Sequence, residues 1–254
     1  MIQKFIFSEI NVLFKFEVKN KKLRLKLPFR IHFDELRQRS FHIFLIFIFF
    51  SLFLFLNVKP IVQFLEIPVN NIKFFQLSPG EYFIETIKIA LYLSFIFIFP
   101  IFLSQFSFFM NPGLTSVEKK FILPLLTGSL ILVSSSFYFS YYCLIPAALQ
   151  FFISYSSDVL EPLWSFTQYF DFILVLFITT ALTFQIPILQ LIVGILGLVS
   201  SSNMLKIWKY VLLIAVIIAA LLTPSTDPIT QLLLSGAIIF LYFLGITILI
   251  FLKY

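Results

Sequence analysis

Hydrophobic residues gather in six long stretches, separated by short segments that carry nearly all of the charges. A helix that crosses about 30 Å of hydrocarbon at 1.5 Å per residue needs roughly 20 apolar residues. The stretches that reach or approach this length are Ser40–Val58, Ile89–Phe109, Phe121–Tyr155, Phe172–Val199, Ile207–Leu222 and Ile229–Leu252. The pattern predicts an all-α, polytopic membrane protein with six transmembrane helices.

The stretches are apolar around their whole circumference, which is typical of helices in lipid, so periodicity does not indicate which faces meet. Phe121–Tyr155 is uncharged over 35 residues, longer than one straight span, and we expect it to protrude into water. Pro100, Pro146 and Pro187 lie inside spans, where each removes an N–H donor and predicts a kink. Kinked helices can enclose a concave wall, although proline is also more frequent in membrane helices generally.

Lysine and arginine are distributed unevenly between the two sides of the predicted bilayer. Fifteen of the 18 fall on one side: ten precede Ser40, two follow the second span, two lie at the start of the fifth and one is at the C-terminus. The other side carries only Lys59, Lys73 and Lys88. Because basic residues stay on the inner side of a membrane, this split predicts that both termini are inside.

Composition supports a membrane location. Hydrophobic residues make up 60% of the 254 and charged residues 12%, against about 25% charged in a soluble domain. The 37 phenylalanines suggest an AT-rich organellar genome. The net charge of +6 is explained by the orientation of the spans, so no nucleic-acid partner is expected. We interpret residues 1–30 as a basic N-terminal extension, not a cleaved signal, and residues 31–254 as one transmembrane domain.

The sequence offers few groups for covalent or metal chemistry. Cys143 is the single cysteine, His32 and His42 are the two histidines, and no metalloprotease, nucleophile-elbow or P-loop motif is present. We therefore expect no cofactor, no metal and no enzymatic activity. No acidic or basic residue lies near the middle of a span, which counts against a self-contained proton-coupled transporter.

Two polar segments precede spans. Asp34 and Glu35 are expected in the first turn of a helix, where negative charge suits the dipole, and Glu35 is spaced to pair with Arg39 at i+4. They are interpreted either as a simple helix start or as carboxylates that receive a cation. Thr115 and Glu118 have the spacing of a capping box, and the Glu118 carboxylate can cap a helix and still face a ligand.

Two more polar positions lie within or between the later spans. Gln185 precedes Pro187 in the fourth span, where it either serves carbonyls freed by the proline or contacts a partner helix. Asp227 followed by Pro228 predicts the N-cap of the sixth span.

These segments together resemble the TatC family, the multi-span receptor subunit of the twin-arginine protein translocase. The resemblance runs from Ile31 to the C-terminus, and residues 163–172 and 204–210 lean toward the plastid and cyanobacterial branch. Five blocks occur in the family's order: HFDELRQR (32–39), SPGEYF (78–83), FMNPGLTSVEKKF (109–121), LTFQIPILQL (182–191) and LLTPSTDPITQ (221–231).

The resemblance implies a concave bundle and two sets of site residues. Signal peptides that bear an Arg-Arg pair are expected to bind at Glu35, Arg37, Phe109, Pro112 and Glu118. Single-span TatA-like and TatB-like subunits are expected to contact Gln185, Leu221, Leu222, Thr223, Asp227 and Gln231. Many bacterial members have glutamate where this chain has Gln185, so an ionisable role there is excluded here.

The resemblance also implies cellular context. We expect a receptor, homo-oligomeric within its complex, in the thylakoid membrane with stromal termini; a bacterial inner membrane with cytoplasmic termini is the alternative. Transport of folded cargo would be driven by the proton gradient across the membrane. The rival functions are a small-molecule secondary transporter, which predicts inverted repeats and midplane polar sites, and an intramembrane enzyme. Neither set of features is found.

Overall fold

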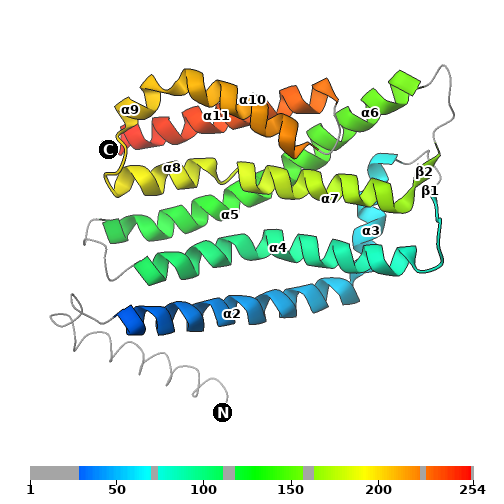
Figure 1. Cartoon of the computed structure of the whole chain (residues 1–254), viewed down its shortest axis with the longest axis horizontal. Helices are drawn as coiled ribbons and strands as arrows, with labels where there is room; N and C mark the ends of the chain where they lie inside the picture. Colours follow the sequence, from blue (N-terminus) through cyan, green and yellow to red (C-terminus); the bar gives the residue numbers. More distant parts are fainter. Residues whose placement is uncertain (1–28, 70–73, 111–117, 157–162, 224–226, 253–254) are drawn as a thin grey trace, which may run out of the picture.

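The computed structural model describes residues 29–69, 74–110, 118–156, 163–223 and 227–252, and these are almost entirely helical (Figure 1). Predictions that concern residues 1–28, Pro112 and Thr115 lie outside the described residues. The α-helices are α2 (Phe29–Leu56), α3 (Val58–Glu66), α4 (Glu81–Met110), α5 (Ile122–Phe139), α6 (Ile145–Ser156), α7 (Phe166–Thr183), α8 (Ile186–Ile195), α9 (Ser201–Lys206), α10 (Trp208–Leu222) and α11 (Pro228–Phe251).

Short elements complete the chain. The 3-10 segments η2 (Ile67–Val69) and η4 (Glu118–Phe121) follow α3 and precede α5, and one π-helical turn, η5 (Ser140–Leu144), joins α5 to α6. Strand β1 (Phe74–Phe75) pairs in parallel with β2 (Trp164–Ser165). The sequence did not predict this ribbon, because two residues per strand are too few to give an alternating pattern.

Five helical stretches in the described residues are long and apolar enough to cross a membrane. The sixth predicted span is α10, which has 15 residues and is shorter than the others. The all-α polytopic fold is confirmed, with five full-length stretches and one short one. The full-length stretches are His32–Leu56, Glu81–Phe109, Lys119–Tyr155, Phe166–Ile195 and Pro228–Phe251.

The three intramembrane prolines behave differently from one another. Pro187 lies in the first turn of α8, and the chain leaves the α-helix between Thr183 and Ile186. Pro146 is the second residue of α6, just after the π-helical turn, where the widened hydrogen-bond pattern accommodates the missing donor. Pro100 lies within α4, which continues through it without interruption.

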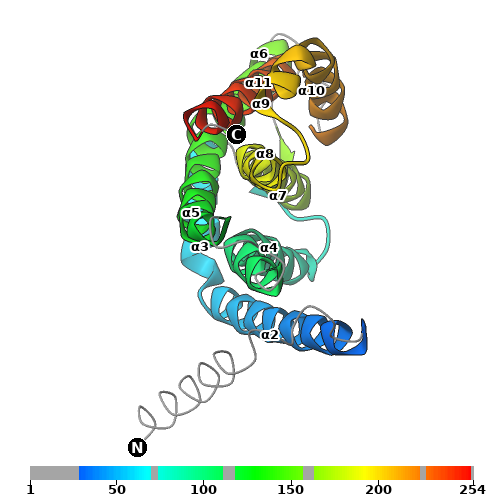
Figure 2. The ribbon, with the colours of Figure 1, turned by 90° about the vertical axis from the view of Figure 1, so that its left-hand side faces the viewer.

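The helices form an elongated, open bundle. Viewed along the helices (Figure 2), α2 and α4 occupy one edge, α10 and α11 the other, and α5 runs along one side, with α7 and α8 between. Helix α2 packs on α4, α4 on α5 and α7, α8 on α11, and α11 on α10. In Figure 1 the starts of α2, α5 and α10 and the ends of α4, α8 and α11 lie at one end of the bundle, which we call the basic end.

The core is divided into clusters that join consecutive helices. The largest contains fully buried residues of α4, α6 and α7, among them Ile89, Ile145 and Phe170. A second joins α8, α9 and α11, and a third joins the π-helical turn to α10 and α11. Helix α2 contributes no fully buried residue to these clusters and only the partly buried Leu54 packs against the largest, so its main contact is with α4.

Candidate binding surfaces

At the basic end, Glu35 is held in place by Arg39. Arg39 Nη2 donates to Glu35 Oε1 over 2.6 Å and Nε donates to the same oxygen over 3.2 Å. The predicted i,i+4 pair is therefore confirmed. The Glu35 side chain is 33% exposed and that of Arg39 is 25% exposed, so the pair lies at the surface but is partly shielded. The other carboxylate oxygen of Glu35, Oε2, receives no hydrogen bond from the described residues.

Arg39 also links the first two spans. Its Nη1 atom donates to Gln105 Oε1 in α4 over 3.3 Å. Phe109 lies one helical turn beyond Gln105 and is half-buried, so both residues share one face of α4. Gln105 could not be predicted from the sequence, because a single glutamine in an otherwise apolar stretch has no pattern that identifies its partner.

The expected place of Asp34 and Glu35 in the first helical turn is wrong. Helix α2 already begins at Phe29, so both carboxylates lie in its second turn and gain less from the dipole. Arg37 pairs with Asp34 over 3.3 Å on an exposed face. Exposed pairs of this kind contribute about 0–1 kcal/mol, so Arg37 is available to other partners.

The remaining residues of this expected site are described only in part. Glu118 opens η4 at the same end of the bundle, directly before α5, but its side chain lies outside the described residues, as does Pro112. The structure therefore brings Glu35, Arg39, Gln105 and Phe109 together on α2 and α4, and leaves the contacts of Glu118 open.

Gln185 lies at the break between α7 and α8 and is 1% exposed. Its Oε1 atom accepts a hydrogen bond from Ser129 Oγ of α5 over 2.7 Å. Its Nε2 atom has no partner among the described residues. A buried amide donor without a partner costs free energy. A polar group that accepted a hydrogen bond from Gln185 Nε2 would therefore bind favourably here.

The turn between α10 and α11 holds the other expected contact residues. Asp227 caps α11, accepting from Thr230 N over 2.8 Å with Pro228 next to it, so the predicted N-cap is confirmed. Thr223 is buried and donates to Ala219 O over 3.0 Å. Leu221 is 79% exposed, Leu222 is at the edge of exposure, and Gln231 is half-buried. Polar groups thus lie beneath an apolar outer surface.

Sequence reasoning missed a polar cluster at the opposite end of the bundle, where α4 and α7 begin. Lys88 Nζ pairs with Glu85 Oε1 over 2.8 Å and with Asp171 Oδ1 over 2.9 Å. The Glu81 carboxylate accepts from Leu77 N and Thr167 Oγ1, each over 2.6 Å. These residues flank apolar stretches in the sequence, a position that is also typical of charged residues in loops. Their helices continue through them because the charges are paired between α4 and α7.

Among the described residues, no group of three or more His, Cys, Asp or Glu side chains is placed to hold a metal ion. The surfaces that the structure describes therefore consist of carboxylates, amides and apolar side chains, which suit recognition of another chain.

Comparisons with known proteins agree over most of the chain. The family described as Sec-independent protein translocase protein (TatC) matches residues 31–236. An uncharacterized tatC-like protein of Trieres chinensis is 54% identical over 240 residues, which cover 94% of this chain and 91% of that protein. The Sec-independent protein translocase protein TATC, chloroplastic, of Oryza sativa subsp. japonica is 46% identical over 216 residues, 84% of this chain and 60% of that protein.

A solved structure has the same fold. The crystal structure of the twin-arginine translocase receptor TatC in DDM aligns with a TM-score of 0.76 at 30% sequence identity. The alignment covers 86% of this chain and 99% of that chain, so it includes nearly every described helix.

Proposed function

This chain belongs to the TatC family of Sec-independent protein translocase subunits, and we propose that it is the receptor that binds twin-arginine signal peptides of folded cargo. It is an integral membrane protein of a plastid or thylakoid membrane. The observation that carries the proposal is the Glu35 carboxylate, oriented by Arg39 and tethered through Gln105 to the face of α4 that bears Phe109.

The chemistry of the pair suits this role. A guanidinium group binds a carboxylate through two parallel N–H donors, which gives both strength and orientation. Among the described residues Arg39 donates only to Glu35 Oε1, so Oε2 and the remaining acceptor capacity of Oε1 would accept the two N–H groups of an incoming arginine. Glu118 provides a second carboxylate for the second arginine, and Phe109 and Pro112 contact apolar parts of the peptide. Arg37, held only by an exposed pair with Asp34, contributes to the same surface.

Partner subunits would bind at the opposite edge of the bundle. TatA-like and TatB-like single-span helices would pack on α10 and α11, where exposed Leu221 and Leu222 lie above Thr223, Asp227 and Gln231. The unpaired Gln185 amide would donate to a polar group that enters the bundle. The chain then acts without covalent chemistry: it recognises cargo and recruits these subunits into a homo-oligomeric complex, and the proton gradient drives the assembled translocase.

Photo-crosslinking to a synthetic Arg-Arg signal peptide in liposomes tests the receptor function. We expect Glu118→Lys to abolish crosslinking while the protein remains folded and inserted, as judged by circular dichroism and protease protection. The matched control is Glu66→Lys, at the end of α3 and away from the basic end. Unchanged crosslinking in Glu118→Lys would contradict the role of this carboxylate.

Purification from native membranes in mild detergent tests the partner proposal. We expect small single-span proteins with amphipathic helices to be recovered with the chain. Recovery of the chain alone would instead support the small-molecule transporter.

A further inference from the structure

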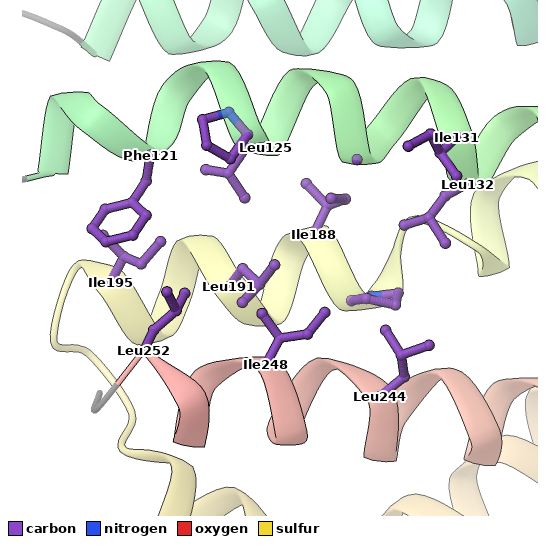
Figure 3. Close-up of a pocket in the computed structure, with 13 residues that line it drawn as sticks. Phe121, Leu125, Ile131, Leu132, Ile188, Leu191, Ile195, Leu244, Ile248 and Leu252 are labelled. Atoms are coloured by element: carbon purple, nitrogen blue, oxygen red, sulfur yellow. The ribbon is translucent and has the colours of Figure 1, made fainter.

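An apolar groove of about 440 Å³ runs between α5, α8 and α11 in the half of the bundle that includes the basic end (Figure 3). Its floor is the buried face of α8, formed by Pro187, Ile188, Leu191 and Ile195. Its walls are side chains of the α5 and α11 regions, which point toward one another across α8 in Figure 3. The wall residues are Phe121, Pro124, Leu125, Gly128, Ile131, Leu132, Leu244, Ile248 and Leu252.

The groove is open toward the surroundings of the bundle. Pro124 and Ile131 are exposed, and Leu125, Leu244 and Ile248 are only half-buried. Gly128 brings α5 close to α8, since a Cβ at this position would lie 3.3 Å from Ile188 Cδ1. The two helices therefore approach each other closely at the level of Gly128.

The chemistry of the walls restricts what can fill this space. Every lining side chain is apolar, and a buried water needs two to four polar partners, so water is a poor occupant. An empty groove would leave its walls without dispersion contacts. A complete α-helix is about 10 Å across with its side chains and is too wide to enter a space of this volume. A single extended hydrocarbon chain fits these constraints.

Charge at the mouth of the groove points to an anionic headgroup. Lys119 and Lys120 are exposed and immediately precede the lining residue Phe121. Each lysine near a membrane surface attracts anionic lipid by about 1 kcal/mol, which corresponds to about fivefold in affinity.

We propose that this groove binds one acyl chain of an anionic lipid, whose headgroup pairs with Lys119 and Lys120. The lipid would fill the space between α5 and α11 and so fix the spacing of the two helices around α8. The groove itself is lined by residues outside the expected peptide surface on α2 and α4 and outside the turn between α10 and α11. Lys119 and Lys120, at its mouth, directly follow Glu118 of the expected peptide surface.

Retention of defined lipids tests the proposal. The full chain is reconstituted in nanodiscs that contain equal amounts of phosphatidylglycerol and phosphatidylcholine, extracted in mild detergent, and analysed for bound lipid by mass spectrometry. We expect about one phosphatidylglycerol per chain and little phosphatidylcholine. Leu244→Trp fills the groove and should lower the retained lipid about tenfold or more. The control Phe240→Trp, at an exposed position of α11 outside the groove, should retain it.

A second variant does not depend on packing. Lys119→Gln combined with Lys120→Gln changes two exposed side chains and should remove the preference for phosphatidylglycerol, by about fivefold per lysine. Equal retention of both lipids by the unmodified chain would overturn the proposal, as would undiminished lipid in a folded Leu244→Trp variant. If Leu244→Trp instead releases a single-span protein from native membranes and leaves the lipid unchanged, the occupant is a partner helix.

Discussion

Arg39 in α2 reaches Gln105 in α4, donating from Nη1 to Oε1 over 3.3 Å. Helix α2 packs mainly on α4, and this hydrogen bond adds a polar link between the two helices near the start of the first span. The same guanidinium orients Glu35. The position of the carboxylate thus depends on an interaction with a residue 70 positions away from it.

Removal of this link should loosen the start of α2. We expect Gln105→Leu to speed amide hydrogen exchange in the first turns of α2 by about fivefold, since a net hydrogen bond contributes about 1 kcal/mol. Signal-peptide crosslinking should fall in parallel. Gln63→Leu, on the exposed face of α3, is the control. Equal exchange in the two variants would show that the link does not hold the helix.

The Ser129–Gln185 hydrogen bond gives a double-mutant cycle. Ser129→Ala alone leaves the buried Gln185 amide without its donor and should lower the free energy of unfolding by about 1–3 kcal/mol. Adding Gln185→Leu removes the orphaned group, so the double variant should recover part of that loss. Thermal unfolding in detergent measures both effects. Additive losses would indicate that the two side chains do not interact.

Gln185→Leu also tests the partner proposal. We expect it to weaken recovery of single-span subunits in detergent more than it lowers thermal stability, because it removes the Nε2 donor that would pair with a polar group of the partner. Undiminished recovery would mean that Gln185 serves only the packing of α5 against the helix break.

The sequence predicted which stretches are helical but not where the helices begin. Helix α4 starts at Glu81, eight residues before the apolar stretch at Ile89, because Glu85 and Lys88 are paired within the structure and do not end the helix. Asp227 was recognised as an N-cap because capping is local, and Pro228 marks the first helical position. Hydrogen bonds such as this cap could be predicted from the sequence because the two interacting residues are neighbours in the chain.

Long-range partners could not be read in the same way. Gln185 and Ser129 are 56 residues apart, and Arg39 and Gln105 are 66 apart. A membrane helix that is apolar on all sides has no periodic stripe to show which face is turned inward. The five family blocks indicated the expected site residues, whereas Gln105, Ser129 and the Lys88 cluster became visible only in the folded chain.

Glu81 ties the start of α4 to the start of α7. Its carboxylate accepts from the backbone of Leu77 and Ser78 and from both the backbone and hydroxyl of Thr167. Glutamine offers one acceptor oxygen in place of two, and its amide would face these donors with further N–H groups. Glu81→Gln should therefore lower the melting temperature by several degrees in detergent. Glu66→Gln, which has no ion pair among the described residues, is the control, and an equal shift in both variants would argue against the tie.

Helix α10 should thin the bilayer around it or be covered by a partner. Its 15 residues reach about 22 Å at 1.5 Å per residue, against a hydrocarbon thickness of about 30 Å. Lys209 near its start must reach toward the water, which shortens the apolar part further. Spin labels placed along residues 207–223 in liposomes, with an aqueous quencher, measure the depth. Labels at Leu221 and Leu222 that lie as deep as those in a full-length span, with neither water nor a partner nearby, would contradict this prediction.

The most direct test of the receptor function measures binding of four signal peptides, with Arg-Arg, Arg-Lys, Lys-Arg and Lys-Lys pairs, to the chain and to its Glu35→Gln and Glu118→Gln variants in nanodiscs. If each carboxylate binds one arginine, each variant should lose about tenfold in affinity for the Arg-Arg peptide. It should lose much less for the peptide whose matching arginine is already lysine. Equal losses for all four peptides, or no loss for the Arg-Arg peptide, would contradict the assignment of Glu35 and Glu118 as the arginine-binding carboxylates.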